Sequence, residues 1–298
     1  MRIIISGASG LIGLALVKRL TEQGHAVARL VRGVVGAGSG DIRWDPVAAE
    51  LDPGALEGAD ALVHLSGENV ASGRWTATKK RAIHDSRVVS TRLIAKTVSA
   101  MKAPPRVWLC ASATGYFGSR GDEELTEDSP PGTGFLAQVC MDWEEATKAA
   151  AEAGIRVVNL LFGVVLSGKG GALGAMLMPI KLGLGGVIGD GRQWVSWITL
   201  EDAVSAIEHI LRTDALAGPV NMVSPGPVTN RELTKTLGRL VRRPTVLPLP
   251  AFAARFVLGE MANKLLLASA RVHPARLLES GFRFRYAEIE SALQSLVT

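Results

Sequence analysis

The sequence predicts an α/β protein: a doubly wound parallel sheet followed by a small, mainly helical C-terminal lobe. Three observations support this fold class. Short segments that are apolar throughout recur in the first two thirds of the chain, they alternate with amphipathic segments of helical length, and the first of them runs directly into a turn with three glycines. Strands that are apolar on both sides are typical of a parallel sheet with helices on both faces.

The N-terminal half predicts regular alternation of strands and helices. Residues 3–5 form the first expected strand, and a helix begins at Leu11 and ends at Gly24. The next expected elements, in chain order, are a strand at 26–32, a short strand at 42–44, a brief helix after Pro53, a strand at 61–67, a long helix at 76–101, a strand at 106–112, a helix at 136–153 that Gly154 ends, and a strand at 155–161.

The chain changes character after residue 161. Eight glycines lie between residues 168 and 189 and a ninth is Gly191, which predicts flexible loops around a short helix. A helix at 201–212 and a strand at 219–223 should return to the sheet. The capping-box pattern Thr229-Asn230-Arg231-Glu232 opens another helix. Helical segments near 251–268, 274–280 and 287–296 complete the lobe.

Composition excludes several classes of protein. Hydrophobic residues make up 47% and charged residues 20%, as in a soluble globular protein. Arg156, Lys169 and Lys181 interrupt the most apolar region, so no run is long enough to span a bilayer and we expect a cytoplasmic protein without membrane contact. Cys110 and Cys140 give neither a disulfide framework nor metal-ligand spacing, so both are expected to be inert core thiols and no metal site is predicted.

Charge is distributed unevenly along the chain, whose formal net charge is +5. Residues 239–285 contain nine Lys or Arg and two acids, whereas residues 121–145 contain eight acids and no Lys or Arg. The basic segment could attract an anionic ligand or dock on the acidic segment. It has no recognised nucleic-acid motif and few aromatic residues, so no nucleic-acid partner is expected.

The glycine turn predicts a dinucleotide site in a Rossmann-type domain. Gly7 allows a tight turn, Gly10 lets a pyrophosphate approach the backbone, and Gly13 lets the helix lie close to the strand. Free N–H groups of the following helix would face the anion, with Ser9, Leu11 and Ile12 beside it. Two alternatives are a purely structural glycine turn and the apolar core of a signal peptide, although no clear cleavage site follows before Arg29.

The residue that ends the second strand favours NADP over NAD. An NAD-preferring domain carries a carboxylate there for the ribose 2′-hydroxyl, whereas this chain has Arg32, which can pair with a 2′-phosphate. The alternative is a solvated surface arginine. We therefore assign residues 1–165 with 197–224 to an NADP-binding domain, and residues 166–196 with 225–298 to a substrate-binding lobe.

With these residues in place, the chain resembles the extended short-chain dehydrogenase/reductase superfamily over essentially its whole length. The signals are the three glycines, Leu65-Ser66-Gly67 at the end of a strand, and the segment 111–118, Ala-Ser-Ala-Thr-Gly-Tyr-Phe-Gly. More narrowly, Ser66-Gly67-Glu68-Asn69, Gly191-Arg192-Gln193-Trp194 and the closing segment 274–284 resemble an atypical branch called epimerase-family proteins. The resemblance implies a Rossmann-type domain, bound NADP and a small variable substrate lobe.

The resemblance fails at the catalytic helix. Superfamily members that perform redox chemistry carry Tyr-x-x-x-Lys there, and the lysine lowers the tyrosine pKa. Here Phe135 is followed by Val139 at that spacing and Leu136 by Cys140, so neither alignment supplies the pair. Substrate charge cannot be inherited from the family either, because two segments lack the polar or cationic residue usual in this branch: Leu161-Phe162-Gly163 and Trp197-Ile198-Thr199.

Two residues are candidates for catalysis. Ser112 ends a strand at the edge where doubly wound sheets bind ligands, and it matches the active-site serine of the superfamily. Tyr116, four residues later, could supply the phenol that the helix lacks. The alternatives are a serine that caps a turn and a tyrosine that packs the loop.

Further candidates surround these two. Leu65, Ser66, Gly67 and Glu68 should lie beside the cofactor, and a carboxylate so close to phosphates must be paired, with Arg74, Arg87 or a ribose hydroxyl. A structural ion pair is the alternative for Glu68. Three residues of the glycine-rich region could form a stacking and hydrogen-bonding wall for the substrate: Gln193, Trp194 and Trp197.

The sequence leaves two functions open. The first is an oxidoreductase or nucleotide-sugar-epimerase-like enzyme that acts on an unknown small substrate. The second is a non-catalytic NADP-binding regulator whose lobe reports the cofactor state to a partner. A homodimer is compatible with either function. His64 is expected to be a hydrogen-bonded strand histidine rather than a catalyst.

Overall fold

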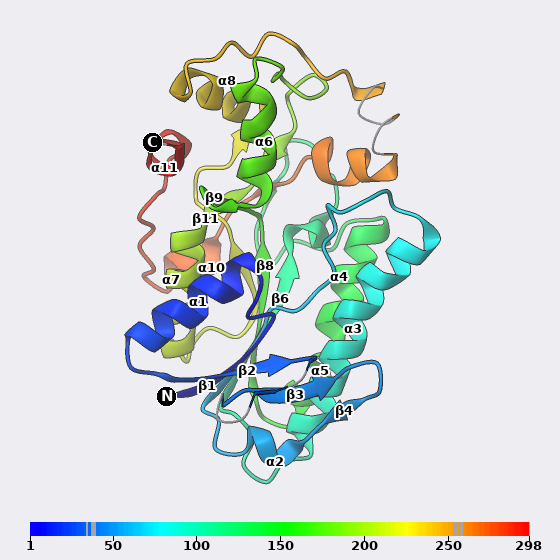
Figure 1. Cartoon of the computed structure of the whole chain (residues 1–298), viewed down its shortest axis with the longest axis vertical. Helices are drawn as coiled ribbons and strands as arrows, with labels where there is room; N and C mark the ends of the chain where they lie inside the picture. Colours follow the sequence, from blue (N-terminus) through cyan, green and yellow to red (C-terminus); the bar gives the residue numbers. More distant parts are fainter. Residues whose placement is uncertain (34, 37–39, 253–255, 257–258, 298) are drawn as a thin grey trace.

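An eight-stranded sheet forms the centre of the computed structural model (Figure 1). The structure describes residues 1–298 except 34, 37–39, 253–255, 257–258 and 298. The strand order is β12-β8-β6-β5-β1-β2-β3-β4, and all neighbours are parallel except β3 and β4. The bounds are β1 Arg2–Ser6, β2 Ala26–Val31, β3 Ile42–Asp45, β4 Glu50–Leu51, β5 Ala61–His64, β6 Val107–Ala113, β8 Arg156–Phe162 and β12 Gly218–Met222.

Helices cover both faces of this sheet, which confirms the predicted doubly wound fold (Figure 1). Ile3 and Ile5 of β1 pack in one core cluster with residues of α1 (Leu11–Glu22) and α7 (Leu200–Arg212). Ile4 packs in a second cluster with residues of α2 (Pro53–Leu56), α3 (Ala77–Ser99) and α5 (Lys148–Glu152). Successive strand residues point to opposite faces, so a strand buried on both must be apolar throughout.

The predicted helix at 136–153 is two helices in the structure. α4 (Phe135–Glu145) and α5 (Lys148–Glu152) are separated at Ala146 and Thr147. The Thr147 hydroxyl donates a hydrogen bond to the Glu144 carbonyl at 2.7 Å, and such side-chain bonds to the backbone compete with the helical pattern. The apolar periodicity continues through the break, which is why the sequence predicted one helix.

The C-terminal lobe has a core of its own. Residues of α6 (Gly171–Lys181), α8 (Asn230–Leu240) and α11 (Ile289–Val297) pack around the fully buried Trp197. Helix α6 is the short helix predicted within the glycine-rich region, and it packs in the lobe core. The short strands here are β9 Val164–Ser167 with β11 Trp197–Thr199, and β10 Trp194–Val195 with β13 Val228–Thr229.

Two predicted lobe helices differ from expectation. The segment 251–268 lies only partly within the described residues, and its described end is a π-helix, Ala262–Leu266. Helix α10 (Ala275–Glu279) does not pack in the lobe, because Leu277 is buried in the core cluster of α1 and α7. In the described part of the chain, no helix is both long and apolar enough to cross a membrane.

The acidic segment docks on the basic C-terminal segment. β7 (Glu124–Leu125) pairs in parallel with β14 (Arg271–Val272), and Arg271 and Glu124 form an ion pair at 2.9 Å. Arg276 pairs with Asp128 at 3.0 Å. The charge distribution allowed the basic segment either to attract an anionic ligand or to dock on the acidic segment. The structure shows the second arrangement.

Candidate functional site

The turn between β1 and α1 is fixed by close backbone contacts. Gly7 has a φ of +70°, and a Cβ there would lie 2.6 Å from the Leu65 carbonyl carbon in the turn after β5. A Cβ on Gly13 would lie 2.2 Å from the Gly7 carbonyl oxygen. Only glycine fits either position, which is the geometry expected of the tight turn and the close helix.

Gly10 differs from the other two glycines. It is the N-cap of α1, with φ −76° and ψ 171°, and a Cβ there would meet only the Gly7 carbonyl oxygen, at 3.3 Å. No side chain caps the N-terminus of this twelve-residue helix. Its first N–H groups and positive dipole end can therefore receive an anion, and the space above Gly10 lets that anion reach the backbone.

Arg32 lies exposed immediately after β2 and next to this turn. It makes no ion pair with any residue that the structure describes. Its charge helps to lower the pKa of the Glu68 carboxyl, which follows β5 on the other side of β1. A cation is thus available at the carboxyl edge of the sheet, beside the turn that can receive the diphosphate.

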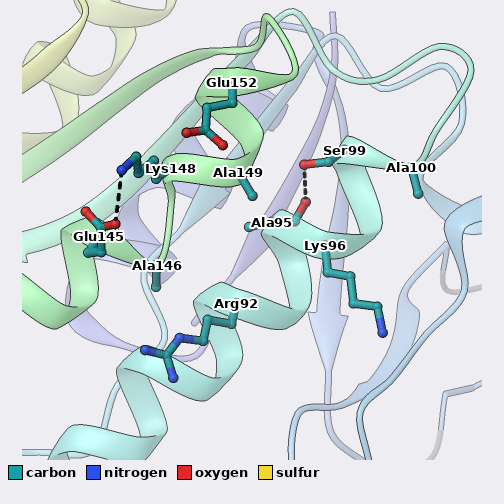
Figure 2. A pocket seen from close by; sticks show the side chains of 10 residues that line it. All are labelled: Arg92, Ala95, Lys96, Ser99, Ala100, Glu145, Ala146, Lys148, Ala149 and Glu152. Atoms are coloured by element: carbon teal, nitrogen blue, oxygen red, sulfur yellow. Dashed lines mark hydrogen bonds and ion pairs between the residues drawn. The ribbon is translucent and has the colours of Figure 1, made fainter.

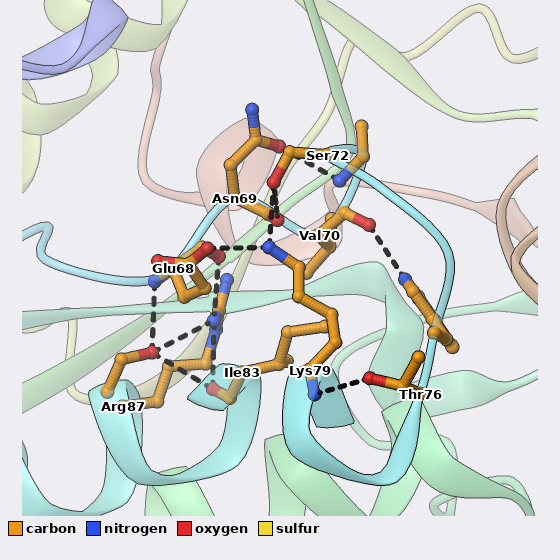
Figure 3. A network of polar contacts seen from close by, with 11 residues as sticks. Glu68, Asn69, Val70, Ser72, Thr76, Lys79, Ile83 and Arg87 are labelled. Carbon is orange, nitrogen blue, oxygen red and sulfur yellow. Dashed lines mark hydrogen bonds and ion pairs between the residues drawn. The ribbon is translucent and has the colours of Figure 1, made fainter. Parts of the chain in front are cut away.

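Glu68 belongs to a network of polar contacts at the end of β5 (Figure 3). Its carboxylate accepts a hydrogen bond from Lys79 of α3 at 2.5 Å, and this bond is the main reason why its pKa is lowered. Arg87 donates to the Glu68 backbone carbonyl at 3.1 Å, and Arg74 donates to the carbonyl of Phe256. The expected partners were Arg74, Arg87 or a ribose hydroxyl. The ion pair with Lys79 instead matches the alternative of a structural ion pair.

Gly67 lies against a partly buried cation. A Cβ on Gly67 would stand 3.1 Å from the guanidinium carbon of Arg87, which stacks over the Trp143 ring at 5.1 Å. Burial lowers the pKa of Arg87. Leu65 and Ser66 connect this glycine to β5, so the predicted segment 65–68 runs along the carboxyl edge of the sheet.

Ser112 meets a carboxyl group that the sequence analysis did not identify. At the end of β6, its Oγ donates to Oε1 of Glu144 at 2.5 Å. Burial raises the pKa of Glu144 to about 7, and the Ser112 hydrogen bond acts in the opposite direction. The only sequence signal for Glu144 is its spacing, because it follows Cys140 by one helical turn on α4.

Tyr116 and the two cysteines adjoin this pair. Tyr116 lies on the 3₁₀ turn η1 (Thr114–Phe117), and burial followed by the nearby Glu144 raises the pKa of its phenol. Cys140 is buried, its Sγ lies 3.7 Å from the Ala113 carbonyl, and its pKa is raised to about 12. Burial also raises the pKa of Cys110. Both thiols are therefore protonated near neutrality, as expected of core cysteines.

The structure places the three residues of the predicted substrate wall in different surroundings. Trp197 is fully buried in the lobe core and its Nε1 donates to the Gly226 carbonyl at 2.8 Å. Gln193 is buried as well, with its amide donating to the carbonyls of Ile188 and Leu266 at 3.0 Å each. Trp194 is half-buried and stacks under Arg271 at 4.6 Å. Trp197 is buried in the lobe core, so it cannot line a pocket in this conformation, whereas the half-buried Trp194 donates from Nε1 to Asp122 Oδ1 at 2.8 Å.

His64 is a structural residue, as predicted. It is fully buried, with Nδ1 2.5 Å from Ser6 Oγ and Nε2 3.1 Å from Ser90 Oγ. Burial lowers its pKa to about 3. The imidazole therefore stays neutral and joins β5 to β1 and α3.

A large surface hollow lies away from these groups. Its volume is about 690 Å³, and it is lined by the C-terminal half of α3 and by the α4–α5 junction (Figure 2). Arg92, Lys96, Glu145 and Glu152 make its rim charged and well hydrated. Helix α3 runs from the carboxyl edge of the sheet toward the amino edge, so this hollow lies near the edge where doubly wound sheets do not bind ligands.

Comparison with known proteins supplies family information. A family model described as NAD dependent epimerase/dehydratase family matches residues 3–224, and one described as a domain of unknown function (DUF1731) matches residues 249–296. An epimerase family protein of Mycobacterium bovis is 44% identical over 291 residues, covering 98% of this chain and 96% of the relative.

Solved structures agree with the sequence matches. The crystal structure of human epimerase family protein SDR39U1 with NADPH has a TM-score of 0.91 and 34% identity, covering 99% of each chain. A nucleoside-diphosphate sugar epimerase from Corynebacterium glutamicum has a TM-score of 0.79 and 38% identity. That match covers 98% of this chain but 57% of the other, so the Corynebacterium protein is much longer.

Proposed function

Because this chain belongs to the NAD dependent epimerase/dehydratase family, we propose that it binds NADP(H) and transfers hydride to or from a small substrate. The observation that carries the proposal is the pairing of an open α1 N-terminus at Gly10 with the exposed cation Arg32. The first suits a diphosphate and the second a 2′-phosphate. The NADPH in the crystal of the human relative supports the same choice of cofactor.

The residues present fit a dinucleotide extended along the carboxyl edge of the sheet. The α1 N-terminus would hold the diphosphate, Arg32 the 2′-phosphate, and the segment 65–68 the ribose beyond it. NADP(H) supplies or accepts the hydride when bound. The substrate would then lie near Ser112, whose hydroxyl can hydrogen-bond to a carbonyl or hydroxyl oxygen.

The proton chemistry must differ from that of Tyr-x-x-x-Lys enzymes. Helix α4 reads FLAQVCMDWEE and contains neither tyrosine nor lysine. Tyr116 is nearby, but its raised pKa makes the phenol a poor base near neutral pH. We therefore propose that reduction of ordinary carbonyl compounds is slow, and that Ser112 and Tyr116 contribute to the activity that exists.

A second candidate is a non-catalytic NADP-dependent regulator, which the same composition of α4 favours. Calorimetry with NADPH and NADH, followed by stopped-flow measurement of hydride transfer to a panel of aldehydes and ketones, separates the two functions. We expect NADPH binding and slow turnover that falls roughly 100-fold in Ser112→Ala and Tyr116→Phe. Tyr286→Phe, at the other tyrosine of the chain, is the matched control.

The outcomes of the calorimetry and the hydride-transfer measurements separate the two functions. Tight NADPH binding with no turnover of any carbonyl selects the regulator. Absence of NADPH binding contradicts both functions. Brisk reduction of a simple ketone that neither substitution affects would place the catalytic centre elsewhere.

A further inference from the structure

Within the part of the chain that the structure describes, a carboxyl group without an ion-pair partner lies behind Ser112. Ser112 is 3% exposed and its Oγ contacts Glu144 Oε1 at 2.5 Å. Among the residues that the structure describes, Glu144 forms no ion pair, whereas its neighbour Glu145 is paired with Lys148 at 3.5 Å. A half-buried carboxylate with a single hydroxyl donor is poorly compensated for the loss of water.

The groups that face Glu144 do not provide the missing charge. Cys110 of β6, Tyr116 of η1 and Cys140 of α4 each interact electrostatically with it, and each has a raised pKa. All three are therefore neutral near pH 7. Arg87 of α3, which is partly buried, stacks on Trp143 and donates to the carbonyls of Glu68 and Ile83.

The helix directs this carboxyl toward the candidate site. Leu136 and Cys140 face η1, since a Cβ on Gly115 would lie 3.4 Å from Leu136 Cβ and 3.8 Å from Cys140 Sγ. Glu144 is the next residue on the same stripe, four positions after Cys140, and it reaches the end of β6. The stripe that faces Ser112 therefore carries one group that can gain or lose a proton near neutral pH.

We propose that Glu144 holds the proton that Ser112 passes to, or takes from, a substrate oxygen. The proposal rests on the proposed hydride-transfer function. When a carbonyl carbon accepts hydride from the reduced nicotinamide, the C=O electron pair moves to oxygen, which takes the proton of Ser112 Oγ. With Glu144 protonated, its carboxyl O–H donates to Ser112 Oγ, so the serine hydroxyl is free to donate to the substrate oxygen. Ser112 then recovers its proton from the Glu144 carboxylic acid, which becomes a carboxylate. Oxidation of an alcohol follows the reverse path, so protons and electrons balance in both directions.

In this arrangement Ser112 contacts the substrate, and Glu144 is a positioning residue that stores the proton. The structural alternative is a hydrogen bond that only fastens α4 to β6. Glu144→Gln separates the two roles, because the amide oxygen still accepts the Ser112 hydrogen bond but cannot hold the proton. Glu145→Gln is the matched control on the same helix, since that side chain is exposed and paired with Lys148.

The first test needs neither substrate nor cofactor. Carbon NMR of protein labelled at the glutamate carboxyls should show one group that titrates near pH 7, absent in Glu144→Gln and present in Glu145→Gln. Ser112→Ala should raise the pKa of that group, because the hydroxyl stabilises its charged form. If every glutamate titrates below about pH 5.5, close to its ordinary range, Glu144 holds no proton and the proposal fails.

The second test asks whether the proton is coupled to the hydride site. NADP⁺ carries a cationic ring and NADPH a neutral one, so a carboxyl at this site should ionise more readily with NADP⁺ bound. The ratio of the NADP⁺ and NADPH affinities removes the contribution of the phosphates, because both cofactors carry the same phosphates. From pH 6 to pH 8, calorimetry should show this ratio shifting roughly three- to tenfold toward NADP⁺.

The shift should persist in Glu145→Gln and in Glu144→Asp, which keeps a carboxyl, and vanish in Glu144→Gln. If Glu144→Gln does not fold, the wild type and Glu144→Asp carry the comparison. Binding of both cofactors with a pH-independent ratio overturns the proposal and leaves the proposed function intact. Failure of both cofactors to bind overturns the proposed function instead.

Discussion

The dinucleotide turn and the end of β6 are built in opposite ways. At the turn, Gly7 and Gly13 are required by backbone contacts made within a few residues or with the adjacent β5. At the end of β6, Ser112 depends on a side chain 32 residues away, on a helix that must first dock against the sheet. The first region would contact its ligand through backbone groups, and its glycines are visible in the sequence as a motif. The second uses side chains whose partnership exists only after folding.

The largest expected effect tests whether the turn between β1 and α1 depends on close contacts between backbone atoms. Gly13→Ala should destabilise the fold by about 3 kcal/mol or more, because its Cβ would overlap the Gly7 carbonyl oxygen and force α1 away from β1. Chemical denaturation measures the loss. Gly174→Ala in α6 is the matched control, since nothing lies within 4 Å of its Cβ, and it should be neutral or stabilising. Equal stabilities for the two variants would contradict the contact.

Gly10→Val separates binding from folding within the same turn. The fold should survive, because the N-cap backbone is extended and a Cβ at this position meets only the Gly7 carbonyl oxygen among the described atoms. NADPH affinity should fall by roughly 100-fold or more, since the side chain occupies the space of the diphosphate. Calorimetry and the thermal midpoint are measured together. Unchanged affinity would place the phosphate site elsewhere.

Arg32→Ala tests the one part of the cofactor site that depends on a side chain. The preference for NADPH over NADH should fall by about 1.5–3 kcal/mol, the usual range for a hydrogen bond to a charged group. The comparison uses the ratio of the two affinities, so a general loss of binding cancels. Arg43→Ala, at an exposed side chain on β3 that pairs with Glu50, should leave the ratio unchanged. A ratio that also stays constant in Arg32→Ala would make Arg32 a surface arginine.

The smallest expected effect is a change of stability with pH that reports the pKa of Glu144 at the end of β6. Because the folded-state pKa of Glu144 is raised to about 7, the folded chain binds this proton more tightly than the unfolded chain. Stability should therefore fall as pH rises from about 4.5 through 7, by on the order of 1–2 kcal/mol after allowance for partial exposure. Glu144→Gln should lose this slope and Glu145→Gln should keep it.

The contribution of His64 to stability changes with pH in the opposite direction, and it does not interfere with the measurement of the Glu144 contribution. Its folded-state pKa is lowered to about 3, so its contribution to stability is lost as pH falls below about 6.5. This loss occurs equally in the wild type and in Glu144→Gln, so the difference between their unfolding free energies isolates Glu144. A difference that does not change with pH would mean that the carboxyl has an ordinary pKa.

Several features followed from sequence because they depend on neighbours along the chain. The burial of Ile3, Ile4 and Ile5 and the closeness of Gly13 to Gly7 are of this kind. The buried thiols and the structural role of His64 were also predicted correctly. For the strand and the turn, the residue types themselves restrict the backbone, and for His64 and the two thiols the apolar residues beside them in sequence indicate burial.

Tertiary structure decided which distant side chains meet. The partner of Glu68 is Lys79, Trp197 fills the lobe core instead of lining a pocket, and Leu277 packs on the sheet rather than in the lobe. Glu144 was missed because a glutamate on an amphipathic helix normally faces water, and nothing nearby in sequence shows that it will be buried against Ser112. Local sequence therefore determined the strands of the sheet and the glycine turn. The protonation states of Glu68 and Glu144 depended instead on how α3 and α4 dock, because burial and pairing are properties of the packed chain.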